Sequence, residues 1–133
     1  MACPYFIPSE PHKRELWTHR DRLPLGDGFA GSCGVTATGC NDETLRLHCN
    51  LGYAECAHLP AERAFDAVRF QLTGEGSATI RLQFACEREH RPALCGELRY
   101  DRVAESWIDP PDPRLVALAD ATVRAWIARR LAH

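Results

Sequence analysis

The stretch that decides the fold is VRFQLTGEGSATIRLQFACE, residues 68–87. In its first part Val68, Phe70 and Leu72 alternate with polar side chains, and a second alternation of the same kind starts at Ile80. A period of two is typical of strands with one buried face, and the segment GEGS between the two runs favours a turn. The stretch therefore predicts a β-hairpin.

A third strand and a final helix follow the hairpin. Residues 94–100 alternate again, with Leu94, Leu98 and Tyr100 on the inward side. The tract DPPDP, residues 109–113, is expected to stop the sheet and start a helix, because aspartate suits the cap and proline the first helical position. Apolar residues then recur at helical spacing, at Leu115, Leu118, Ala119, Thr122, Val123, Trp126 and Ile127.

We predict a single domain over residues 1–133, of the α+β class, because strands followed by a helix favour a sheet covered on one face. A chain of this length buries enough surface for one core. Residues 66–133 are expected to form a three-stranded antiparallel sheet covered by the C-terminal helix. Residues 1–60 are expected to be a cysteine-rich, metal-binding loop region with one short helix over residues 42–51, capped by Asp42.

Cysteine is the most informative residue type, with seven in 133 residues. Five of them precede residue 57 and adjoin glycine, proline or other turn-forming residues, where backbone N–H groups can reach sulfur. The N-terminus shows no secretory signal, so we expect a cytoplasmic protein whose thiols stay reduced unless a metal holds them. A metal or cluster site is the first interpretation, and a disulfide framework or reactive thiols are the alternatives.

The cysteine spacing bears on which metal is bound. No Cys-x2-Cys pair occurs, although structural zinc sites nearly always use one, and the close cysteine runs of bacterial ferredoxins are missing too. The ligands must therefore come from separate loops, which suits a cubane cluster because it is several ångströms across. We predict a [4Fe–4S] cluster, with zinc as the alternative.

Two of the cysteines suit ordinary roles better than ligation. Cys86 continues the inward row of its strand and is expected to be a small buried hydrophobe. Cys95 falls on the outward face of the third strand and is expected to be a partly exposed thiol. The other five compete for four ligand places: Cys3, Cys33, Cys40, Cys49 and Cys56.

Three motifs resemble those of a group of small uncharacterised bacterial proteins, which we interpret as iron–sulfur proteins. They are CPYFxP from Cys3, LPLGDxxxGxC up to Cys33, and CNxGYA from Cys49, and the similarity is best over the first 60 residues. The resemblance implies that Cys3, Cys33, Cys49 and Cys56 are the ligand set. Cys40 lies outside the motifs and is the reserve ligand. The resemblance implies no activity.

The predicted cluster would join the N-terminal tail, the glycine loop and the short helix, with Gly31, Gly34 and Gly52 admitting backbone N–H groups to the sulfides. Such a protein would carry electrons for a redox partner protein or sense redox state. Two alternatives stay open. One is a zinc-stabilised interaction module, and the other is a thiol-based redox protein in which Cys40 or Cys95 reacts.

Other functions find little support in the sequence. A net charge of −2 gives no basic footprint for nucleic acid, and no run reaches the roughly 20 apolar residues of a membrane span. The GxGxxG pattern of residues 26–31 does not follow a predicted strand or open a predicted helix, as a dinucleotide site requires. No hydrolytic or nucleotide-dependent site is recognised, so enzymatic activity and oligomeric state are left open. His48 and His58 are interpreted as neighbours of the cysteines rather than as ligands.

Overall fold

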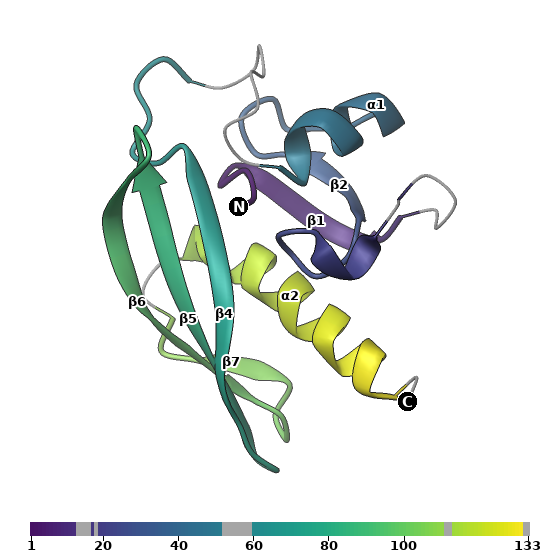
Figure 1. The fold of residues 1–133 in the computed structure, drawn as a ribbon, viewed down its shortest axis with the longest axis vertical. Helices are drawn as coiled ribbons and strands as arrows, with labels where there is room; N and C mark the ends of the chain where they lie inside the picture. The colour runs from purple at the N-terminus through teal and green to yellow at the C-terminus, as the bar shows by residue number, and fades with distance from the viewer. Residues whose placement is uncertain (13–16, 18, 52–59, 111–112, 132–133) are drawn as a thin grey trace.

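The computed structural model describes residues 1–12, 17, 19–51, 60–110 and 113–131, in which the chain forms two antiparallel sheets and a long C-terminal helix (Figure 1). The N-terminal sheet has the order β1-β2-β3, with β1 Phe6–Pro11, β2 Phe29–Cys33 and β3 Thr38–Gly39. The C-terminal sheet has the order β4-β5-β6-β7, with β4 Ala67–Glu75, β5 Thr79–Arg88, β6 Arg91–Asp101 and β7 Ser106–Ile108. The helices are η2 Arg20–Arg22, α1 Asp42–Thr44, η3 Leu45–Cys49 and α2 Pro113–Leu131.

The predicted fold class is wrong. Residues 1–60 contain a three-stranded sheet instead of loops around one helix, and the C-terminal sheet has a fourth strand, β7. Strand β1 escaped prediction because it contains Pro8 and Pro11, which lack the N–H groups of a sheet ladder. Proline is tolerated at a sheet edge, and β1 is the edge strand of its sheet.

The hairpin prediction is confirmed. Strands β4 and β5 pair with Val68 opposite Cys86, and the residues at 80, 82, 84 and 86 are buried while Arg81 and Gln83 are exposed. Strand β6 also buries Leu98 as expected. The sequence predicts that Leu94 faces inward, but its side chain is 42 % exposed. Leu94 lies next to a register shift that disrupts the ladder between β5 and β6.

Helix α2 begins at Pro113 as predicted, while the proposed cap Asp112 lies outside the described residues. The predicted apolar stripe is buried at its centre, for example at Leu118 and Val123. Two small residues outside that stripe, Ala121 and Ala125, are buried as well. The helix therefore has two packed faces.

The second face of α2 explains how two sheets share one core. Figure 1 shows α2 beside both sheets, and it contacts β1 directly. The Arg124 guanidinium donates to the backbone oxygen of Ser9 at 3.2 Å, and that of Arg129 donates to the oxygen of Gly26 at 2.8 Å. Apolar residues of both sheets and of α2 belong to one buried cluster in the described part of the chain.

The segment before β1 joins the sheets at a second point. Ala2 donates its N–H to the oxygen of Val68 at 2.7 Å and accepts the N–H of Val68 at 2.9 Å. This bridge pairs the chain start with the edge strand β4. Ala2 is fully buried, so the residues that follow, including Cys3, start from a fixed position.

The short helix predicted over residues 42–51 is present but ends earlier. It runs through α1 and η3 and stops at Cys49. Its cap is Asn41 rather than Asp42, because the Asn41 side chain accepts the N–H of Thr44 at 2.8 Å. Among the helices of the described residues, none has the length and apolar character needed to cross a membrane.

Candidate metal centre

Cys3 and Cys33 lie at the same end of the β1–β2 ladder. Cys33 is the last residue of β2 and stands opposite Phe6, the first residue of β1. The carbonyl of Cys3 accepts the N–H of Phe6 at 3.2 Å, which closes a turn just before β1. The N–H of Gly34 donates to the oxygen of Tyr5 at 2.8 Å and extends the contact beyond the ladder. The sheet register therefore brings two predicted ligand segments together.

Cys40 lies on the other side of β2. It follows β3 directly, and its N–H donates to the oxygen of Gly31 at 3.2 Å. In the same ladder Cys33 stands opposite Thr38. Cys33 is thus the last residue of β2, and the segments that carry Cys3 and Cys40 both contact the last three residues of this strand.

The thiols of Cys40 and Cys49 are in contact, with their Sγ atoms 3.3 Å apart. Cys49 is the last residue of η3 and is 7 % exposed, whereas Cys40 is partly buried and packs against the core. A disulfide would need a separation of about 2.05 Å. Two thiolates on one tetrahedral ion with bonds of about 2.3 Å would lie about 3.8 Å apart. A short displacement of the two sulfur atoms would therefore be enough either to form a disulfide or to place both thiolates on one metal ion.

The Cys33 thiol sits in a turn that favours its ionised form. Burial alone would raise the pKa of this thiol, but hydrogen bonds from the backbone N–H groups of Thr36 and Val35 and from the Thr36 side chain hold the pKa below its ordinary value. The N–H of Ala37 donates to the carbonyl of Cys33 at 2.8 Å and closes the turn. Backbone N–H groups aimed at sulfur are what metal-bound thiolates use.

Asn50 fixes the position of Cys49 and was missed by the sequence reasoning. Its side chain is fully buried, the one buried polar residue among those described. The amide accepts the N–H of Phe29 at 3.0 Å and donates to the oxygens of Phe29 and Leu45, both at 3.0 Å. It thereby joins the end of η3 to β2. The only sequence signal was its place directly after Cys49.

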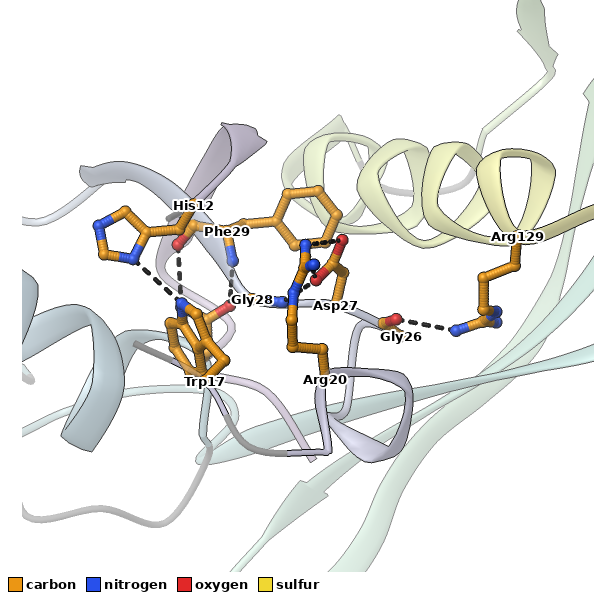
Figure 2. A network of polar contacts seen from close by, with 9 residues as sticks. His12, Trp17, Arg20, Gly26, Asp27, Gly28, Phe29 and Arg129 are labelled. Atoms are coloured by element: carbon orange, nitrogen blue, oxygen red, sulfur yellow. Dashed lines mark hydrogen bonds and ion pairs between the residues drawn. The ribbon is translucent and has the colours of Figure 1, made fainter. Parts of the chain in front are cut away.

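The loops that surround the N-terminal sheet are held by a polar network (Figure 2). The indole N–H of Trp17 donates to Nδ1 of His12 at 3.1 Å, so the proton of the neutral ring lies on Nε2, which is 2.8 Å from Oδ1 of Asp42. This chain of contacts joins the end of β1 to the first turn of α1. A side chain at Gly28 would collide with the Trp17 ring, which explains the glycine.

The GxGxxG segment belongs to the same network. Asp27 pairs with the Arg20 guanidinium at 2.6 Å and accepts the N–H of Gly28 at 2.8 Å (Figure 2). Gly26 has a positive φ of 80°, which favours glycine, and its oxygen accepts from Arg129. The last three residues of the segment belong to β2 and the segment opens no helix, so Gly26 and Gly28 serve this loop while Gly31 lies in the strand.

The described part of the chain contains no group of three His, Cys, Asp or Glu side chains placed to hold a metal ion. The predicted ligands Cys3, Cys33 and Cys49 therefore do not converge as such a group, and Cys56 lies outside the described residues. A close thiol pair instead joins Cys49 to Cys40, the reserve ligand.

The remaining predictions near the site have mixed outcomes. Cys86 is fully buried and Cys95 is exposed, as expected from their strand positions. The ring Nδ1 of His48, beside Cys49, is buried and has no hydrogen-bond partner in the structure. Buried nitrogen atoms without a hydrogen-bond partner are rare in proteins. His58 and Gly52 lie outside the described residues.

No protein-family model, curated protein or solved structure matches this chain. The similarity to the bacterial cysteine-motif group therefore stays a prediction that rests on the three motifs.

Proposed function

We propose that this protein holds an iron–sulfur cluster on cysteine thiolates and uses it for electron transfer with a partner protein or for redox sensing. The contact between the Cys40 and Cys49 thiols, 3.3 Å apart, supports metal–thiolate binding, and the lack of a Cys-x2-Cys pair in the sequence favours a cluster. Two thiols from separate segments converge there beside a buried core, as metal ligands do. The pair supplies two thiolates, and two of the predicted ligands Cys3, Cys33 and Cys56 supply the others.

The environment of the thiols supports a redox role. The N–H groups aimed at Cys33 stabilise a thiolate, and hydrogen bonds to sulfur are among the features that set the reduction potential of a cluster. Cys3, Cys33 and Cys40 are partly exposed, so a centre built on them would lie near the surface, within reach of a partner. The proposal requires reduced thiols and therefore a reducing compartment, which fits the cytoplasm.

Zinc is the second candidate, and the thiol spacing favours it. The sulfur separation of 3.3 Å is closer to the roughly 3.8 Å expected for two thiolates on one tetrahedral zinc than to the length of a disulfide bond. A zinc centre would make the protein a structural module for interactions, without electron transfer. The predicted [4Fe–4S] cluster, by contrast, has one cysteine on each iron.

Metal and acid-labile sulfide analysis, with a visible spectrum, tests the proposal on protein purified without oxygen. Iron and sulfide in equal amounts with broad visible absorption would support the iron–sulfur protein. Stoichiometric zinc without sulfide would replace it with the structural module. A folded protein with neither metal would contradict both and favour thiol chemistry.

Two variants make this test specific to the site. Cys49→Ser should abolish metal binding, because Cys49 belongs both to the predicted ligand set and to the observed pair. Cys95→Ser is the matched control, since Cys95 is exposed on β6 in the other sheet and should not alter the metal content.

A further inference from the structure

We infer that Cys40 and Cys49 are ligands of one and the same metal atom. The inference rests on the proposed function, and it adds which two thiolates share a metal. It also makes Cys40 a ligand, although the sequence motifs left it as a reserve.

The short sulfur separation carries this inference. Two thiolates on one tetrahedral metal lie about 3.8 Å apart, so the sulfurs, now at 3.3 Å, need to separate by only about 0.5 Å. In a four-cysteine [4Fe–4S] cluster every iron takes one cysteine, and ligand sulfurs on neighbouring irons are farther apart. In a four-cysteine [2Fe–2S] cluster each iron takes two. The pair therefore suits a zinc ion or one iron of a [2Fe–2S] cluster.

Backbone contacts on both sides hold the pair at this separation. The N–H of Cys40 is bonded to Gly31, and Asn50 bonds the end of η3 to Phe29. Both anchors, Gly31 and Phe29, belong to β2. The residues that carry the two thiols are thus both tied to the same strand, on one side through the fully buried amide of Asn50.

Cobalt(II) bound to the metal-depleted, reduced full-length chain reports the number of thiolates on the ion through sulfur-to-metal charge-transfer absorption. A tetrahedral ion has at most four thiolates, so losing one removes at least about a quarter of the absorption per bound cobalt. We expect Cys40→Ser and Cys49→Ser each to cause a loss of this size or to abolish binding. Cys95→Ser should leave the absorption unchanged.

A measurement on the wild-type chain keeps the inference testable if a variant does not fold. Zinc is titrated into reduced protein, and alkylation of each cysteine is followed by mass spectrometry. The Cys40 and Cys49 thiols should become protected together, at the same zinc concentration. Protection of Cys49 without Cys40, or full cobalt absorption in Cys40→Ser, would overturn the inference.

The outcomes separate this inference from the proposed function. If the purified chain carries four iron and four sulfide, and both cysteines are needed to hold them, the iron–sulfur proposal stands and the shared metal atom is excluded. If neither iron, zinc nor cobalt binds the wild-type chain, the proposed function itself fails.

Discussion

At the scale of single residues, Asn50 is the side chain on which the position of Cys49 depends. A buried amide with three hydrogen bonds ties the backbone of Phe29, whose strand partner in β1 is Pro11, to the end of η3. Its loss would leave buried backbone N–H and C=O groups without partners, which costs more than the net value of the bonds themselves. The tie between the end of η3 and Phe29 of β2 would then be lost.

We therefore expect Asn50→Ala to lower the free energy of unfolding by about 2–4 kcal/mol, measured by urea denaturation. Asn41→Ala is the matched control, because Asn41 is an exposed helix cap and its loss should cost about 1 kcal/mol. Equal losses in the two variants would show that Asn50 has no special role.

Asp66 makes the stability depend on pH. The backbone N–H of Glu89, 2.7 Å from its Oδ2, lowers the pKa of this carboxyl below its ordinary value of 3.8, burial opposes the shift, and Arg63 adds to the lowering. Because the pKa is lower in the folded state, the ionised group contributes stability above pH 3.8, and that contribution is lost as the pH falls through the folded pKa.

Asp66→Asn should consequently lower the free energy of unfolding at pH 7 by about 1–3 kcal/mol, so that the variant unfolds in less urea than the wild type. This difference should shrink below about pH 4. Urea curves from pH 7 down to pH 3 provide the measurement. A difference that stays constant over this range would exclude the carboxylate as its source.

At the scale of secondary structure, helix α2 is the element that decides the architecture. One face carries the predicted apolar stripe, while alanines at 121 and 125 provide a second face small enough for close approach. The Ala125 methyl group faces Gly26, and a Cβ added at Gly26 would be in ordinary van der Waals contact with it at 3.6 Å. The helix can therefore pack against both sheets.

Ala125→Leu should destabilise the fold by about 1–3 kcal/mol through overpacking, seen as a lower thermal midpoint. Ala128→Leu places the same side chain at an exposed position one turn later and should change the midpoint little. If both variants melt like the wild type, the second face of α2 is not tightly packed.

The strands show which parts of the fold the sequence predicts and which parts it does not. Alternation in residues 68–87 predicts β4 and β5 because those strands have one buried face. The N-terminal sheet has no such signal, since Pro8 and Pro11 interrupt β1 and β2 is short. The Cys40–Cys49 contact joins residues on different elements, and spacing along the chain does not determine a contact of that kind.

At the scale of the whole molecule, the thiol pair lies where three parts of the N-terminal half meet. Strand β2, the residue after β3 and the end of η3 all contribute to its position. A metal bound there would link these parts, so binding and folding of this half would be coupled. The four-stranded sheet has its own extensive ladder and does not depend on such a link.

Removing the metal with a chelator should therefore speed amide hydrogen exchange in β2 and η3 by at least about tenfold, and affect β5 much less. This prediction follows from the local nature of opening in proteins, where each region exchanges according to its own stability. Equal acceleration in both sheets would indicate that the metal stabilises the whole chain rather than the N-terminal half.

The most direct test of the central claim is the native mass of the intact chain, purified without oxygen and compared with its mass after denaturation. We predict that the native mass exceeds the denatured mass by one bound metal centre, and that Cys49→Ser loses this excess while Cys95→Ser keeps it. Identical native and denatured masses, with all thiols reduced or with Cys40 and Cys49 joined in a disulfide, would contradict a metal–thiolate protein.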